Sequence, residues 1–187
     1  MGKKAVGIDV DGVLADTISV WLNDIEGKFG IRAMKRDMIR YELHEILPGM
    51  TQRYVFDSWR EVWEDYKRIR LEDPDIPSIV DNLHEKFEIY ITTANPSPRI
   101  KDWLRENSIA YDKFVHFSSH NDKHELDGVG IYIDDFHEVI RNVAGCGKKA
   151  VILRQPWNDE FIKANKDPNV LVAYNWREIE DILLEEV

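Results

Sequence analysis

The fold of this chain is decided by its N-terminal stretch, Ala5-Val6-Gly7-Ile8-Asp9-Val10-Asp11-Gly12-Val13-Leu14-Ala15-Asp16-Thr17. The apolar run is typical of a buried strand; it ends in two aspartates, and Gly12 then breaks the strand pattern. Residues two apart in a strand project to the same side, roughly 6–7 Å from each other. We therefore expect Asp9 and Asp11 together at the carboxyl end of a strand, where open α/β sheets bind ligands.

Two carboxylates this close repel each other, so the pair indicates a bound divalent cation or a shared proton. An ordinary strand followed by an Asp-Gly turn is the competing interpretation, and taken alone it is the more common one. A calcium loop is a further competitor, but it requires an oxygen ligand where Val13 stands and a glycine where Leu14 stands. The choice depends on residues further along the chain.

Composition restricts the class of protein. A chain of 187 residues predicts one domain, or a core domain with a small insertion. The 35 acidic against 25 basic residues give a net charge of −10, which disfavours a nucleic-acid polymer as partner but allows a small phosphorylated ligand in a locally positive pocket. The single cysteine, Cys146, suits a reducing compartment, and we find no signal peptide or membrane-spanning stretch. We expect a cytoplasmic monomer or homodimer without a membrane partner.

Hydrophobic periodicity predicts a helical insertion that follows the first strand and returns to the main domain at residues 72–77. Helices are expected over residues 16–29 and 51–70, with a weakly patterned segment over 31–50 that contains a Pro48-Gly49 turn. Strands then alternate with helices: strands over 87–93, 114–118, 129–133, 149–153 and 170–174, and helices over 77–86, 98–107, 136–144 and from 175 onward. This order predicts an α/β fold, a doubly wound parallel sheet covered on both faces.

Polar residues that could bind a ligand or take part in a reaction recur at the ends of these strands. Thr92 and Thr93 end one strand, although threonine is common in strands for its β-propensity alone. Asp134 and Asp135 end another, although aspartate also caps helices well. Lys123 lies in a loop upstream, where spacing alone favours an ordinary solvated lysine.

Taken in order, the chain resembles the haloacid dehalogenase superfamily of phosphotransferases in four motifs: Asp9-Val10-Asp11-Gly12-Val13, Ile91-Thr92-Thr93, Lys123 and Ile133-Asp134-Asp135. The resemblance covers residues 5–155 and implies a Rossmann-like fold of the haloacid dehalogenase type. It also implies that residues 17–75 form a small helical cap over a core of residues 1–16 and 76–187. An aspartate at position 11 resembles the phosphatases rather than the ion pumps or the dehalogenases.

The resemblance implies a role for each motif. Asp9 would be the nucleophile that forms an aspartyl-phosphate, and Asp11 the acid and base. Mg²⁺ would sit on the Asp9 carboxylate, the main-chain carbonyl of Asp11 and the Asp134–Asp135 pair. Thr93 and Lys123 would hold the phosphoryl oxygens.

A narrower resemblance connects the chain to the 5′(3′)-deoxyribonucleotidase group and its uncharacterised bacterial relatives. It rests on the size, the position of the insertion and the late stretch Ile152-Leu153-Arg154-Gln155-Pro156-Trp157-Asn158. It implies a nucleoside monophosphate as substrate, with Thr92, Ala94 and Arg99 near the phosphate. Ala94 replaces the serine that is frequent in that group, and Arg99 is the nearest counterpart of a further basic residue.

Two features of the chain leave alternatives open. The aromatic residues Phe56, Trp59, Trp63 and Tyr66 could stack a base, but their helical spacing favours packing by roughly two to one. The three histidines at positions 116, 120 and 124 do not share a helical face in this prediction and do not indicate zinc. The function predicted is a Mg²⁺-dependent nucleotidase; the alternatives are a phosphatase of a sugar phosphate or phosphoglycolate, and a catalytically silent binding module.

Overall fold

The computed structural model describes residues 2–40 and 49–187, apart from the side chains of Gln52 and Phe56. Its described part holds one sheet of parallel strands in the order β3-β2-β1-β4-β5-β6. The strands are β1 (Lys4–Ile8), β2 (Phe87–Thr93), β3 (Lys113–His116), β4 (Val129–Asp134), β5 (Lys149–Leu153) and β6 (Val170–Ala173). The strand order reverses between β1 and β4, which is where doubly wound sheets bind ligands. The predicted fold class is confirmed.

Helices cover both faces of the sheet, and the strand side chains alternate between two cores. Ile131 and Ile133 of β4 lie in the larger core, while Tyr132 between them lies in the smaller one. The larger core also contains side chains of α4 (Ile76–His84), α5 (Arg99–Glu106) and α8 (Trp176–Leu184), and the smaller core those of α6 (His137–Gly145). Strands buried on both faces read as continuous apolar runs, which is why the sequence revealed them clearly.

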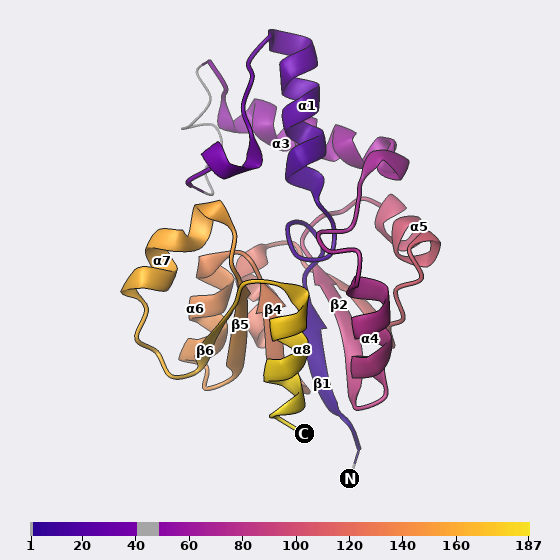
Figure 1. The fold of residues 1–187 in the computed structure, drawn as a ribbon, viewed down its shortest axis with the longest axis vertical. Coiled ribbons are helices and arrows are strands. Elements are labelled where there is room, and N and C mark those ends of the chain that lie inside the picture. The colour runs from indigo at the N-terminus through magenta and orange to yellow at the C-terminus, as the bar shows by residue number, and fades with distance from the viewer. Residues whose placement is uncertain (1, 41–48) are drawn as a thin grey trace.

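Two helices of the insertion, α1 (Thr17–Phe29) and α3 (Gln52–Glu64), lie beyond the carboxyl ends of the strands (Figure 1). Asp16 caps α1 by accepting a hydrogen bond from the main-chain N–H of Ser19 at 3.3 Å. The two helices are joined by a buried hydrogen bond from Trp21 Nε1 to Ser58 Oγ at 2.8 Å. The insertion therefore has its own packed contacts and stands over the strand ends that carry Asp9 and Asp134.

The chain leaves the sheet for the insertion and returns from it along two adjacent segments. The main-chain N–H of Asp16 donates to the carbonyl of Arg70, and the N–H of Glu72 donates to the carbonyl of Leu14, both at 2.9 Å. Ala15 and Leu71 form an antiparallel bridge between these bonds. The insertion is thus attached through a short two-stranded linker.

Several predicted boundaries were wrong. The helix predicted over 51–70 ends at Glu64 and is followed by a 3₁₀ turn, Tyr66–Arg68, because contacts of Tyr66 with Glu106 and of Arg68 with Asp24 override the periodicity. The strand predicted over 114–118 spans Lys113–His116.

Short elements escaped prediction. The segment after β3 that was expected to be a loop is a 3₁₀ helix, His120–Glu125, and a 3₁₀ turn at Pro156–Asn158 precedes α7 (Asp159–Ala164). Such elements are too short to show a hydrophobic period. Pro48 of the predicted turn lies outside the described residues, whereas Gly49 has a φ of +81°. None of the described helices has the length and apolar character needed to span a membrane.

Candidate active site

Lys123 connects two of the strand ends through its ammonium group. Its Nζ donates to Asp9 Oδ1 at 2.5 Å and to Asp134 Oδ2 at 2.8 Å, and its side chain is fully buried. Asp9 follows β1 and Asp134 ends β4, while the 3₁₀ helix His120–Glu125 is anchored by a hydrogen bond from the Tyr132 hydroxyl to the Lys123 carbonyl at 2.7 Å. The sequence pattern alone favoured a solvated loop lysine here, and that interpretation was wrong.

Asp135 completes a group of three buried aspartates. Carboxylate oxygens of Asp9, Asp134 and Asp135 lie within 4.8 Å of one another, and this is the one such group found among the described residues. Lys123 compensates one of the three negative charges, so a divalent cation would neutralise the remainder. Hard cations such as Mg²⁺ take oxygen ligands, and the donor set consists of oxygens. The residues present fit a metal ion of this kind.

The electrostatics follow from burial of like charges. Burial raises the pKa of the Asp9 carboxyl, and Asp134 and Asp11 add to the rise, against the opposing effect of Lys123. Burial likewise raises the pKa of Asp135, reinforced by Asp134. Burial opposes the charge of Lys123, but Asp134 and Asp9 outweigh it and raise the pKa of its ammonium. The lysine is therefore a permanent cation, and the aspartates need positive charge to stay ionised together.

Asp11 stands apart from this group. Its Oδ1 accepts a hydrogen bond from Trp63 Nε1 and its Oδ2 one from Asn95 Nδ2, each at 3.0 Å. Burial raises the pKa of the Asp11 carboxyl, and both hydrogen bonds oppose the rise. A carboxyl group that is held by neutral donors, beside but outside the aspartate group, is suited to exchange a proton.

The two threonines of β2 have different surroundings. Thr93 Oγ1 accepts a hydrogen bond from the main-chain N–H of Asn95 at 3.0 Å, so its own hydroxyl proton is left to donate elsewhere. Thr92 is buried, and its hydroxyl has no hydrogen-bond partner among the described residues. A Cβ on Gly7 would lie 3.3 Å from Thr92 Cγ2. The side chain of Thr92 therefore lies beside Gly7, two residues before Asp9. Thr93 is the last residue of β2, and its hydroxyl lies at the end of the strand.

The remaining predicted substrate contacts are dispersed. Ala94 is half-buried directly after β2, and Arg99 is exposed at the start of α5, where it pairs with Asp102 at 3.6 Å. Trp59 is half-buried with its ring 5.9 Å from that of Trp21. These placements fit packing for Trp59 and a surface position for Arg99.

Trp63 reaches the site in a way that its spacing did not predict. Its ring is fully buried, 6.0 Å from the Trp103 ring in an edge-to-face arrangement, so it contacts Asp11 through its N–H and offers no open face to a base. Among the other aromatic residues, Tyr66 donates to Glu106 at 2.6 Å, and the side chain of Phe56 lies outside those described.

Four residues that contact the aspartates or the adjoining backbone were not predicted from the sequence. Besides Asn95, Trp157 Nε1 donates to Asp135 Oδ2 at 2.8 Å, and Gln155 Nε2 donates to the Gly12 carbonyl at 2.9 Å. Asn158 Nδ2 donates to the Asp135 carbonyl at 2.9 Å. Three of the four residues belong to the stretch Gln155-Pro156-Trp157-Asn158, and the physical signal for them is a group of polar side chains directly after a buried strand, β5.

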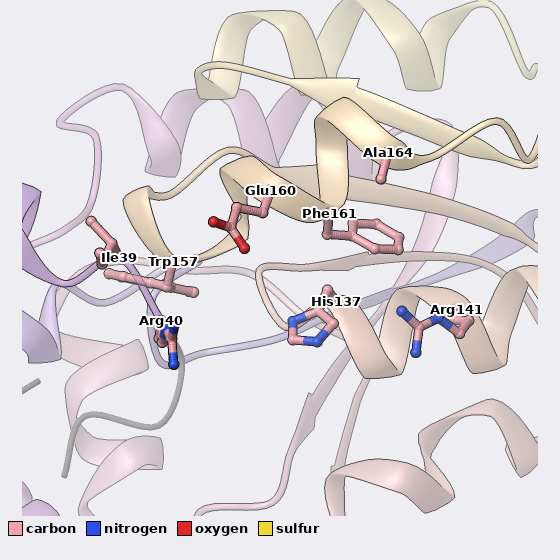
Figure 2. A pocket seen from close by; sticks show the side chains of 8 residues that line it. All are labelled: Ile39, Arg40, His137, Arg141, Trp157, Glu160, Phe161 and Ala164. Atoms are coloured by element: carbon pink, nitrogen blue, oxygen red, sulfur yellow. The ribbon is translucent and has the colours of Figure 1, made fainter. Parts of the chain in front are cut away.

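Trp157 also borders a groove of about 390 Å³. Figure 2 shows this groove, which extends from Trp157 to Phe161 and Arg141. It is lined by Ile39, Arg40, His137, Arg141, Trp157, Glu160, Phe161 and Ala164. None of these is one of the aspartates, so the groove adjoins the candidate site without containing it.

The fold and the site together define a class. A doubly wound sheet with paired aspartates after its central strand, a buried lysine and two aspartates at the end of the neighbouring strand β4 has the arrangement of the haloacid dehalogenase-like phosphatases. A family model described as 5′ nucleotidase, deoxy (pyrimidine), cytosolic type C protein matches residues 3–186. The chain belongs to this family and is a hydrolase of phosphoric monoesters.

Solved structures agree with this assignment at the level of the fold. A haloacid dehalogenase-like hydrolase from Streptococcus pneumoniae has a TM-score of 0.70 at 16% identity, over 97% of this chain and 98% of that one. A protein from Clostridium acetobutylicum described as a predicted phosphatase also scores 0.70 at 16% identity, over 99% and 100%. A hydrolase of the same superfamily from Bacillus subtilis, solved with magnesium, scores 0.62 at 14% identity, over 98% and 99%. No curated protein matches the sequence.

Proposed function

We propose that this chain is a Mg²⁺-dependent phosphomonoesterase that forms an aspartyl-phosphate on Asp9 and acts on 5′-(deoxy)nucleoside monophosphates. The observation that carries the proposal is Lys123, which bonds Asp9 and Asp134 inside a buried group of three aspartates. Family membership supports the nucleotide as substrate.

In the first step, the Asp9 carboxylate attacks phosphorus while the bond between phosphorus and the ester oxygen breaks. Asp11 donates its proton to the departing oxygen, so that the nucleoside leaves as an alcohol. Lys123 bonds Oδ1 of Asp9, which leaves Oδ2 for the attack. Two of its three N–H groups are engaged by Asp9 and Asp134, and the third, with the Thr93 hydroxyl, binds phosphoryl oxygens.

In the second step, Asp11 is a carboxylate and takes a proton from a water molecule. The water oxygen attacks phosphorus, the bond between phosphorus and Asp9 breaks, and inorganic phosphate leaves. This restores the Asp9 carboxylate and the protonated Asp11. The hydrogen bonds from Trp63 and Asn95 keep Asp11 in place through both transfers.

The carboxylates of Asp9, Asp134 and Asp135 would hold the metal ion, with the main-chain carbonyl of Asp11. When bound, Mg²⁺ supplies positive charge against the charge that develops on the phosphoryl oxygens. The oxygen-only donor set and the uncompensated carboxylates support this choice. The similar hydrolase from Bacillus subtilis was solved bound to magnesium.

We assign residues 1–16 and 76–187 to a core and residues 17–75 to a helical cap that selects the substrate. The paired linker segments at Asp16–Arg70 and Leu14–Glu72 support this division. So does the position of α1 and α3 beyond the strand ends (Figure 1).

Phosphate release from 5′- and 3′-nucleotides and from sugar phosphates tests the proposal, with Mg²⁺ and with a chelator. We expect release to require the metal, to be fastest with a deoxynucleoside 5′-monophosphate, and to fall at least about 1,000-fold in Asp9→Asn, which lacks the nucleophile. Asp127→Asn is the matched control, because Asp127 is an exposed aspartate in the turn that precedes β4, at the end of that strand opposite Asp134.

Full metal-dependent turnover by a folded Asp9→Asn protein would refute the mechanism. The same dependence on Asp9 with a sugar phosphate preferred would retain the mechanism and reject the nucleotide as substrate.

A further inference from the structure

The carboxylate of Asp11 is held from two sides by groups on different parts of the chain. Trp63 Nε1, on α3 of the insertion, donates to Oδ1, and Asn95 Nδ2, in the loop after β2, donates to Oδ2, each at 3.0 Å. With one donor on each oxygen, the plane of the carboxyl group is fixed rather than free to rotate.

The position of Trp63 is set by packing. Its ring is fully buried and meets the ring of Trp103 at 82°, with centroids 6.0 Å apart. Trp103 is itself fixed on α5, because its Nε1 donates to the carbonyl of Ile69 at 2.9 Å. The indole N–H of Trp63 therefore reaches Asp11 only while α3 rests against α5.

The amide of Asn95 is oriented by its own loop. Its Oδ1 accepts a hydrogen bond from the main-chain N–H of Ser97 at 3.0 Å, which turns Nδ2 toward Asp11. Its main-chain N–H donates to Thr93 Oγ1 at 3.0 Å. One short loop thus aligns the threonine hydroxyl and the carboxyl group together.

We infer that Trp63 and Asn95 are positioning residues that aim the Asp11 carboxyl at the leaving oxygen, and that proton donation therefore depends on α3 lying on the core. The inference rests on the proposed function, in which Asp11 protonates that oxygen. It assigns Trp63 a role other than stacking on a base. It also connects the insertion directly to a chemical step.

Leaving groups of different basicity distinguish this role from a structural one. The alkoxide of a nucleoside is a poor leaving group and needs the proton, whereas p-nitrophenolate leaves readily without it. A misdirected acid therefore slows formation of the aspartyl-phosphate from the alkyl ester and spares its formation from the aryl ester. The second step, in which Asp11 is the base, is the same for both esters, and kcat/KM does not include it because kcat/KM reports only the steps up to release of the alcohol or phenol. A general loss of structure slows both.

The experiment compares kcat/KM for a deoxynucleoside 5′-monophosphate and for p-nitrophenyl phosphate, with Mg²⁺, in the native chain and its variants. For Trp63→Phe and Asn95→Ala we expect kcat/KM on the nucleotide to fall about 10- to 100-fold. On the aryl ester we expect less than about a threefold change in kcat/KM. Asp11→Asn should show the same selectivity in kcat/KM more strongly.

Trp21→Phe is the matched control, because it also removes a buried indole hydrogen bond, to Ser58 Oγ at 2.8 Å, but one that lies within the insertion. We expect its ratio of the two kcat/KM values to equal that of the native chain. If Trp63→Phe does not fold, Asn95→Ala decides alone, since Asn95 lies in a loop after β2.

Equal losses of kcat/KM on both esters in Trp63→Phe and Asn95→Ala, or no loss of kcat/KM on the nucleotide, would overturn the inference and leave the proposed function standing. A native chain that hydrolyses neither ester with Mg²⁺ would refute the proposed function, and the inference with it.

Discussion

Gly12 shows how closely the backbone approaches the aspartate group. Its φ is +79°, in the left-handed region that is unfavourable for residues with a Cβ, and a Cβ added there would lie 2.5 Å from Asp135 Oδ2. We predict that Gly12→Ala lowers the free energy of unfolding by about 1–2 kcal/mol through backbone strain. It should also displace Asp135 and reduce phosphate release. Urea unfolding and the phosphate assay measure the two effects.

The variant Gly147→Ala separates the effect of backbone strain from that of the close contact with Asp135. Gly147 has a similar φ of +75°, but a Cβ there would meet no atom within 4 Å. We expect this variant to lose a similar stability and to retain turnover. Equal turnover in the two variants would mean that the close approach of Gly12 to Asp135 is unimportant.

His120 illustrates how the site affects a neighbouring residue. Burial, together with the positive charge of Lys123, lowers the pKa of His120 to about 4, against the opposing effect of Asp134. His120 therefore binds a proton near pH 6.5 in the unfolded chain but only near pH 4 in the folded chain. The free energy of unfolding falls as the pH drops from about 6.5 toward 4. Between pH 7.5 and 5 we predict a loss of about 2 kcal/mol in the native chain relative to His120→Asn.

Urea unfolding of both proteins at the two pH values measures this difference, and comparing the variants cancels the titration of the aspartates. A His120 signal that titrates near pH 6.5 in the folded protein, followed by NMR, would contradict the prediction.

At the scale of elements, an ion pair spans the linker between the insertion and the sheet. Lys35 Nζ lies 2.6 Å from Glu72 Oε1 and 3.3 Å from Asp16 Oδ1, so it joins the residue directly before α1 to the returning segment. The Glu72 side chain is only 10% exposed. Burial raises the pKa of Glu72 to about 7, against the opposing effect of Lys35.

We predict that Lys35→Met lowers the free energy of unfolding by about 2 kcal/mol at pH 8.5, because it leaves a buried carboxylate without its cation. A carboxyl group whose pKa is raised on folding lowers the free energy of unfolding as the pH rises and the group ionises. The difference in free energy of unfolding between Lys35→Met and the native chain should therefore shrink toward pH 5.5, where Glu72 is protonated. Urea unfolding at several pH values measures this.

The double variant Lys35→Met/Glu72→Gln is the control. With the carboxylate removed as well, most of the loss at pH 8.5 should be recovered, giving a coupling energy between the two residues. A loss that is equal at pH 5.5 and pH 8.5 would show that Lys35 acts through packing and not through its charge.

The strands were predictable from the sequence because they are apolar and buried on both faces, and their ends brought Asp9, Thr93 and Asp134 to one edge of the sheet. The contact of Trp63 with Asp11 was not, since it joins residues 52 positions apart through the packing of α3 on α5. Local pattern carries no such information. The burial of Lys123 was likewise hidden, because a lysine in a short 3₁₀ helix has the same local pattern as one in a loop.

At the scale of the whole molecule, negative charge exceeds positive charge in the buried candidate metal site as well as in the chain as a whole. Against the three buried aspartates of the candidate metal site stands one buried lysine, in a chain with a net charge of −10. Repulsion among these carboxylates opposes folding, and a divalent cation bound by the folded state alone would relieve it. We therefore expect metal binding to stabilise the folded protein.

We predict that Mg²⁺ at 100 times its dissociation constant raises the free energy of unfolding by about 2.7 kcal/mol, measured by urea unfolding with Mg²⁺ and with a chelator. In Asp135→Asn most of this gain should vanish, because one ligand is lost. With chelator present, however, this variant should be at least as stable as the native chain, because it removes a repelling charge and its amide oxygen can still accept the bond from Trp157 Nε1. Asp127→Asn, in the exposed turn before β4, should keep the full response. A gain from Mg²⁺ that is the same in all three proteins would mean that the ion acts by general screening, and that the three aspartates do not bind it.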